Sequence, residues 1–125
     1  MTTVALILLT TGIIMTFIPG AVLELLGMEA APVALLLIQI LGGIYFGFGM
    51  LNWMARDTLI GGIYNRPLAI GNLSHFFISG MALLKGFGGQ QQLPLALWGA
   101  VVCYAAFGIL FAIILFTDPS RKTHS

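Results

Sequence analysis

The segment AAPVALLLIQILGGIYFGFGMLNWMA, residues 30–55, decides the fold of this chain because it contains no charged residue over 26 positions. A membrane-spanning helix needs about 20 apolar residues. A charged side chain at the middle of a bilayer costs at least about 2.5–3.5 kcal/mol, so such side chains are rare inside spans. The segment therefore predicts a membrane-spanning helix, with Pro32 in its first turn, where the missing N–H of proline is no loss.

Three further charge-free windows flank this segment, at residues 1–23, 67–84 and 86–117. Each is long enough for one span, and proline and glycine residues mark where the helices end. The sequence predicts helices over about 3–18, 32–55, 67–85 and 94–116, with a short interfacial helix over 21–28. We expect an all-α fold, a four-transmembrane-helix antiparallel bundle that forms a single membrane domain over residues 1–125.

The composition excludes several classes of protein. The 125 residues include five basic and four acidic ones, which is 7% charged where about 25% is usual for a soluble domain. A soluble cytoplasmic enzyme could not cover its surface with so few charges, and a nucleic-acid-binding protein would need a basic face. The single cysteine excludes a disulfide framework and a cysteine-based zinc site.

The basic residues predict the orientation in the membrane. With four spans, Arg56, Arg66, Arg121 and Lys122 fall on one side and only Lys85 on the other. Loops rich in lysine and arginine stay in the cytoplasm. We therefore expect the N-terminus and the C-terminus to be cytoplasmic.

Polar side chains inside the spans gather in the second and third predicted helices, at Gln39, Tyr45, Asn52, Asn72, His75 and Ser79. Positions 72, 75 and 79 share one helix face, and His75 falls near the middle of the membrane. Three interpretations stay open for it. It is a neutral histidine bonded across the bundle to Gln39, Tyr45 or Asn72, or part of a polar ligand site for a lipid head, a quinone carbonyl or a proton relay. The third is a haem or metal ligand, although the only other histidine is His124 in the tail.

Two smaller patterns belong to the same helices. Gly43 and Gly47 have the G-x-x-x-G spacing that lets another backbone approach, for packing inside the bundle, for homodimerisation or beside a flat ligand. Trp53, Arg56 and Arg66 lie at the predicted cytoplasmic mouth of the helix pair. Arginines there bind lipid phosphate or hold an anion at the entrance to a cavity.

The run Leu41–Arg56, followed by Arg66-Pro67 and Gly71-Asn72, resembles the small uncharacterised bacterial four-helix membrane proteins of the DoxX-like group. The resemblance implies a multi-pass protein of the bacterial inner membrane, sometimes associated with redox or quinone-linked partners. It brings no catalytic residues with it.

The sequence contains no paired carboxylates, no nucleophile–base arrangement and no phosphate-binding loop. We expect a non-catalytic accessory or scaffold bundle that interacts with membrane lipids and with another membrane protein or a second copy, and that binds neither metal nor nucleic acid. The alternative is binding of a quinone or another small hydrophobic ligand in a pocket between the second and third helices. A minimal transporter is a third interpretation, disfavoured because no charged residue lies inside a span.

Overall fold

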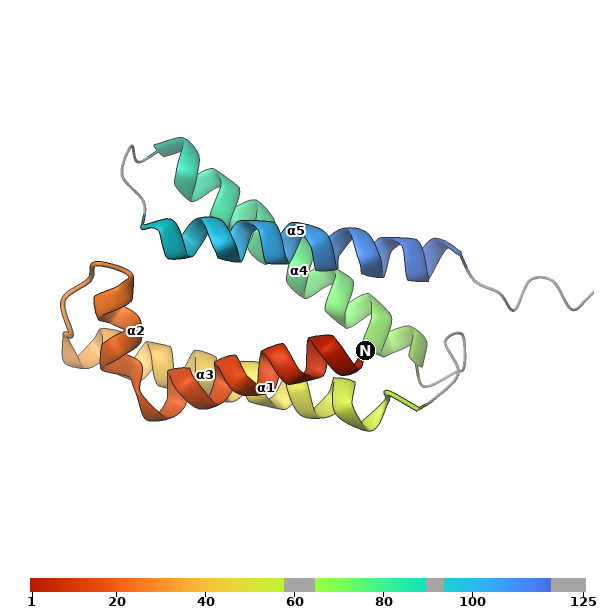
Figure 1. Cartoon of the computed structure of the whole chain (residues 1–125), viewed down its shortest axis with the longest axis horizontal. Coiled ribbons are helices and arrows are strands. Elements are labelled where there is room, and N and C mark those ends of the chain that lie inside the picture. The colour runs from red at the N-terminus through yellow and green to blue at the C-terminus, as the bar shows by residue number, and fades with distance from the viewer. Residues whose placement is uncertain (58–64, 90–93, 118–125) are drawn as a thin grey trace, which may run out of the picture. The chain divides into compact units, whose positions relative to one another are not determined.

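The computed structural model describes residues 1–57, 65–89 and 94–117, and it is all-α, as predicted. Figure 1 labels five helices along the chain, α1 (Thr2–Phe17), α2 (Pro19–Leu25), α3 (Pro32–Met54), α4 (Asn65–Gly89) and α5 (Leu95–Phe116). The chain divides into two compact units, Met1–Arg56 and Asp57–Ser125, and each is described by itself below. The antiparallel four-helix bundle and the single membrane domain stay predictions.

Three of the helices are long and apolar enough to cross a membrane. They are α3, the part Asn65–Gly86 of α4 and the part Leu97–Phe116 of α5, with 23, 22 and 20 residues and mean hydropathies of 2.0, 1.4 and 2.5. At 1.5 Å per residue they measure about 30–35 Å, which matches a hydrocarbon core of about 30 Å. The chain is thus a small multi-pass membrane protein.

The N-terminal helices α1 and α2 differ from the predicted first span. They pass the same test only together, and they are bent by 102° at Ile18. Pro19 follows the bend as the first residue of α2, and its missing N–H removes the bond that would have continued α1. The described residues therefore contain three long spans and a bent pair that gives a fourth only if α1 and α2 cross together.

The helix boundaries follow the prediction closely except in α2 and α4. The predicted short helix over 21–28 differs from α2, which begins at Pro19 and ends at Leu25, because proline suits the first turn of a helix and Gly27 in the left-handed conformation ends it. The predicted ranges 32–55 and 94–116 lie within one residue of α3 and α5. The predicted range 67–85 is too short at both ends, because α4 begins at Asn65 and ends at Gly89. Pro67 is tolerated inside the first turn, where backbone N–H groups have no partner in the helix, and an isolated glycine such as Gly86 weakens a helix without ending it. Gly61 and Gly62, which predict a turn between the second and third spans, lie outside the described residues.

The unit Met1–Arg56 is built on a close contact between the backbones of α1 and α3, which lie side by side in Figure 1. A Cβ atom added at Gly42 would lie 2.8 Å from the Thr16 amide nitrogen and 2.9 Å from the Gly12 carbonyl oxygen, and one added at Gly49 would lie 2.8 Å from the Leu9 amide nitrogen. These distances are shorter than a methyl group allows. Buried α1 side chains complete the contact, at Val4, Ala5, Leu8 and Met15.

The glycines in this contact are not the predicted pair. A Cβ atom at Gly43 or Gly47 would meet no atom within 4 Å among the described residues. One residue of helix turns the side-chain direction by about 100°, so a shift from Gly43 to Gly42 changes the helix face. Packing of Gly43 and Gly47 inside the bundle, against a second copy or beside a flat ligand stays a prediction.

The short helix α2 is held at both ends. At the bend, the Gln39 side-chain amide donates a hydrogen bond to the Thr16 carbonyl oxygen at 3.4 Å. Thr16 lies in the last turn of α1, where carbonyl groups have no partner within the helix. At the other end, the Gly27 N–H donates to Glu24 O and the Met28 N–H to Leu23 O, both at 2.9 Å, with Gly27 at φ +68°. This pair of bonds is a Schellman motif, in which glycine adopts the left-handed conformation without steric cost.

Candidate functional site

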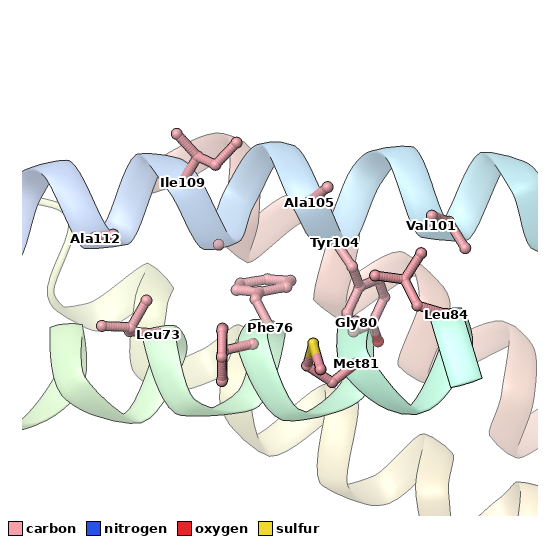
Figure 2. Close-up of a pocket in the computed structure, with 12 residues that line it drawn as sticks. Leu73, Phe76, Gly80, Met81, Leu84, Val101, Tyr104, Ala105, Ile109 and Ala112 are labelled. Carbon is pink, nitrogen blue, oxygen red and sulfur yellow. The ribbon is translucent and has the colours of Figure 1, made fainter. Parts of the chain in front are cut away.

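The candidate site is a groove of about 390 Å³ between α4 and α5, within the unit Asp57–Ser125. Figure 2 shows side chains of both helices around it. The α4 wall consists of Leu73, Phe76, Phe77, Gly80, Met81 and Leu84. With the exception of Tyr104, every side chain that lines the groove is apolar. The pocket that the sequence predicts between α3 and α4 stays a prediction, since these helices belong to different units.

Small residues on α5 leave room for the groove. Ala105, Gly108 and Ala112 line it at positions i, i+3 and i+7, so they share one face of the helix. A Cβ atom added at Gly108 would lie 3.9 Å from the Phe76 Cβ, which is an ordinary van der Waals distance. The helices are therefore in contact here without the tight backbone approach of α1 and α3, and a hollow remains beside the contact.

Buried aromatic rings fix the position of α4 against α5. The Phe76 and Phe111 side chains are 3% and 0% exposed, and their rings stack at 5.9 Å with an interplanar angle of 10°. The Phe107 ring lies 5.2 Å from the same Phe76 ring, and the Tyr104 ring meets it edge-on at 5.3 Å. These ring contacts hold α4 against α5, and two of the rings, Phe76 and Tyr104, also line the groove.

Tyr104 provides the polar group of the groove. Figure 2 shows its ring reaching from α5 toward α4 near Gly80, and a Cβ atom at Gly80 would lie 3.8 Å from the Tyr104 Cβ. The Tyr104 hydroxyl oxygen lies 3.5 Å from the His75 Nε2, and the two ring centroids are 5.6 Å apart. Since 3.5 Å is long for such a hydrogen bond, His75 holds this hydroxyl only weakly.

Sequence reasoning identified His75 but missed this partner. The structure describes a hydrogen bond between His75 and Tyr104 of α5, while bonds to the predicted partners Gln39, Tyr45 and Asn72 stay predictions. A tyrosine in the middle of an otherwise apolar span is the signal that could have found it, because a hydroxyl group in lipid needs a partner within the protein.

The two buried asparagines of the predicted site bond within their own helices. Asn52 and Asn72 are both 0% exposed. The side-chain amide of Asn52 donates to Phe48 O at 2.9 Å, and that of Asn72 donates to Leu68 O at 3.0 Å. Both bonds reach the carbonyl four residues earlier, so each asparagine has an amide donor satisfied within its own helix.

The remaining predicted site residues divide between the two units. Gln39 and Tyr45 belong to Met1–Arg56 together with Asn52, while Ser79 belongs to Asp57–Ser125 together with Asn72 and His75. Gln39 is exposed, and Tyr45 and Ser79 are half-buried. A ligand site that joins these six residues stays a prediction.

At the end of α3 the structure brings two of the three predicted mouth residues together. The Arg56 guanidinium lies 4.0 Å from the centroid of the Trp53 ring, and its Nη1 donates to the Trp53 carbonyl at 3.2 Å. Both contacts stabilise the C-terminal turn of α3, where a cation is favoured. Arg66 is exposed in the first turn of α4, in the other unit.

Within residues 1–57, 65–89 and 94–117, no three histidine, cysteine, aspartate or glutamate side chains gather as metal ligands. His124, Arg121 and Lys122 lie outside these ranges. The polar chemistry described for the groove is therefore that of a hydroxyl group next to an imidazole, which can form hydrogen bonds with a bound molecule.

Comparison with known proteins gives no relative: no family model matches the chain, and no curated protein or solved structure is significantly similar to it. The resemblance to the DoxX-like group consequently rests on the motifs of residues 41–72 alone.

Proposed function

We propose that this membrane protein is a non-catalytic accessory protein that holds a small hydrophobic molecule in the groove between α4 and α5. The groove itself carries the proposal, because its volume of about 390 Å³ lies within the range of about 300–1,000 Å³ typical of ligand pockets. Phe77, Met81 and Ile109 line it and are 62%, 54% and 62% exposed. A molecule dissolved in the lipid can therefore enter from the side.

The dimensions of the groove favour an elongated occupant. Its lining runs from Leu73 to Leu84 on α4 and from Val101 to Ala112 on α5. At 1.5 Å per residue each stretch measures about 16 Å. A chain or a ring with a tail fills such a space better than a compact polar molecule does. Membrane lipids are thus the first partners that we propose. In a scaffold role, the same unit, Asp57–Ser125, would also bind another membrane protein or a second copy.

A second candidate function keeps the predicted site between α3 and α4, where a quinone or another small hydrophobic ligand would bind near Asn52, Asn72 and His75. The complete burial of both asparagines favours it, because polar side chains buried inside a membrane span often mark a ligand site. The two candidates need different tyrosines, Tyr104 for the groove and Tyr45 for the predicted site.

Photolabelling tests the groove. We expect a long-chain alkyl diazirine in phosphatidylcholine nanodiscs to label peptides that contain Phe77–Leu84 and Val101–Ala112 in preference to other lipid-facing peptides. Ala105→Phe places a ring in the groove and should lower this labelling several-fold. Ala106→Phe is the matched control, because Ala106 is exposed on the same helix and does not line the groove. Uniform labelling of all lipid-facing helices, or equal labelling of the two variants, would overturn the proposal.

We also propose that the protein resides in the cell inner membrane with both termini in the cytoplasm. The arginines Arg56 and Arg66 support this orientation, with Lys85 alone on the opposite side, because basic residues are retained in the cytoplasm.

Cysteine accessibility tests the orientation in a Cys103→Ala background, which removes the single native thiol. We expect Gly86→Cys to react with a membrane-impermeant maleimide in intact cells, and Asp57→Cys to react only after permeabilisation, since both positions are exposed at span ends. The reverse pattern would contradict the orientation. If a peptide tag placed before Met1 is accessible from outside intact cells, α1 and α2 do not cross the membrane together.

A further inference from the structure

We infer that the occupant of the groove is a neutral lipid that carries one carbonyl or hydroxyl group, and that the Tyr104 hydroxyl recognises this group. The inference rests on the proposed function and adds the chemical class of the ligand. The inferred ligands are neutral lipids, which dissolve wholly in the hydrocarbon layer. Phospholipids do not, and they are excluded as ligands.

The polarity of the lining supports a single hydrogen-bonding group on the ligand. Tyr104 alone among the lining residues has a side-chain hydroxyl, and the others have carbon chains, rings or the Met81 thioether. A ligand with several polar groups would bury most of them against carbon, which costs free energy for each one left without a partner. One carbonyl or hydroxyl group can be satisfied, and a purely hydrocarbon ligand would leave the hydroxyl unused.

The histidine beside Tyr104 makes its hydroxyl suitable for either kind of ligand group. If the His75 Nε2 carries a proton, it donates to the Tyr104 oxygen and leaves the O–H free to donate to a ligand carbonyl. If it carries none, it accepts from the Tyr104 O–H, whose oxygen can then accept from a ligand hydroxyl. The distance of 3.5 Å leaves the hydroxyl free to turn toward a ligand.

The depth of these groups excludes the polar part of a phospholipid. Tyr104 lies about 10 Å along α5 from the start of the span at Leu97 and about 18 Å from its end at Phe116. His75 lies about 15 Å along α4 from Asn65 and about 16 Å from Gly86. Both are near the middle of a hydrocarbon core of about 30 Å, whereas phosphate and ester groups stay at its surface. Only a molecule that is soluble in the core can bring its polar group to Tyr104.

Competition between two probes of equal size tests the inference. Octyl phenyl ketone and nonylbenzene differ by a carbonyl in place of a methylene group, and each is titrated against the alkyl diazirine label in nanodiscs. For the unmodified protein we expect the ketone to compete more strongly. Tyr104→Phe keeps the ring and removes the hydroxyl. It should therefore weaken competition by the ketone about two- to tenfold, the value of one hydrogen bond, and leave competition by nonylbenzene unchanged.

Tyr45→Phe tests the second candidate site in the same assay, because Tyr45 belongs to α3 and does not line the groove. We expect it to change neither probe. If Tyr104→Phe leaves the ketone unchanged while Ala105→Phe blocks both probes, the inference is wrong and the groove remains a binding site. If competition by the ketone is weakened in Tyr45→Phe and not in Tyr104→Phe, the inference is also wrong and the second candidate site gains support. If neither probe competes and the diazirine labels no groove peptide, the inference and the proposed function both fail.

Discussion

Phe111→Ala is expected to lower the free energy of unfolding by about 2–4 kcal/mol, the largest loss among the substitutions considered for this protein. The Phe111 ring is fully buried and stacks on Phe76, so its removal leaves a cavity where α4 and α5 meet. In lipid the cost comes from lost packing contacts more than from transfer out of water, which sets the value below the upper end known for soluble proteins. Unfolding by dodecyl sulfate in maltoside micelles, followed by circular dichroism, measures it.

The matched control is Phe116→Ala on the same helix. The Phe116 side chain is 83% exposed, so its removal should change the free energy of unfolding by less than about 0.5 kcal/mol. Similar losses for the two variants would contradict the described packing of α4 on α5.

Gly42→Ala is expected to lower the free energy of unfolding by about 1–3 kcal/mol. The added methyl group would meet backbone atoms of Gly12 and Thr16 within 3 Å, and backbone cannot turn aside as a flexible side chain can. The helices must therefore move apart along the contact that joins α1 to α3. The same titration with dodecyl sulfate measures the change.

Gly43→Ala, one residue further along the helix, provides the comparison. A methyl group there meets nothing within 4 Å among the described residues, and alanine favours a helix over glycine by about 1 kcal/mol. We expect this variant to be as stable as the unmodified protein or slightly more stable. If Gly43→Ala were the more destabilising of the two, the assignment of the contact to Gly42 would be wrong.

The long spans could be predicted from the sequence because charged side chains are excluded from lipid, and α3 and α5 begin and end within one residue of their predicted limits. The ends of α4 were harder to predict. Pro67 reads as a start signal, yet the helix begins at Asn65, and Gly86 reads as a stop signal, yet the helix continues to Gly89. A proline in the first turn and a lone glycine are both compatible with a helix, so neither fixes a boundary.

The groove could not be predicted because hydrophobic periodicity carries little information in a span that is apolar all round. In α5 the buried Phe111 and the exposed Ile109 and Phe116 are equally apolar, so the sequence does not tell which of them faces α4. The same reasoning explains why Gly43 and Gly47 were selected by spacing, while Gly42 and Gly49 make the contact. Polar residues are the exception, and His75 was identified for that reason although its partner Tyr104 was not.

The compact unit Met1–Arg56 has a consequence for the order of events during biosynthesis. All residues that its helices need for their mutual contact have been translated before residue 57 is added. Translation at about 5–20 residues per second then requires several seconds to complete the chain, whereas helices form within about a microsecond. The pairing of α1 with α3 can therefore be complete before α5 has been translated.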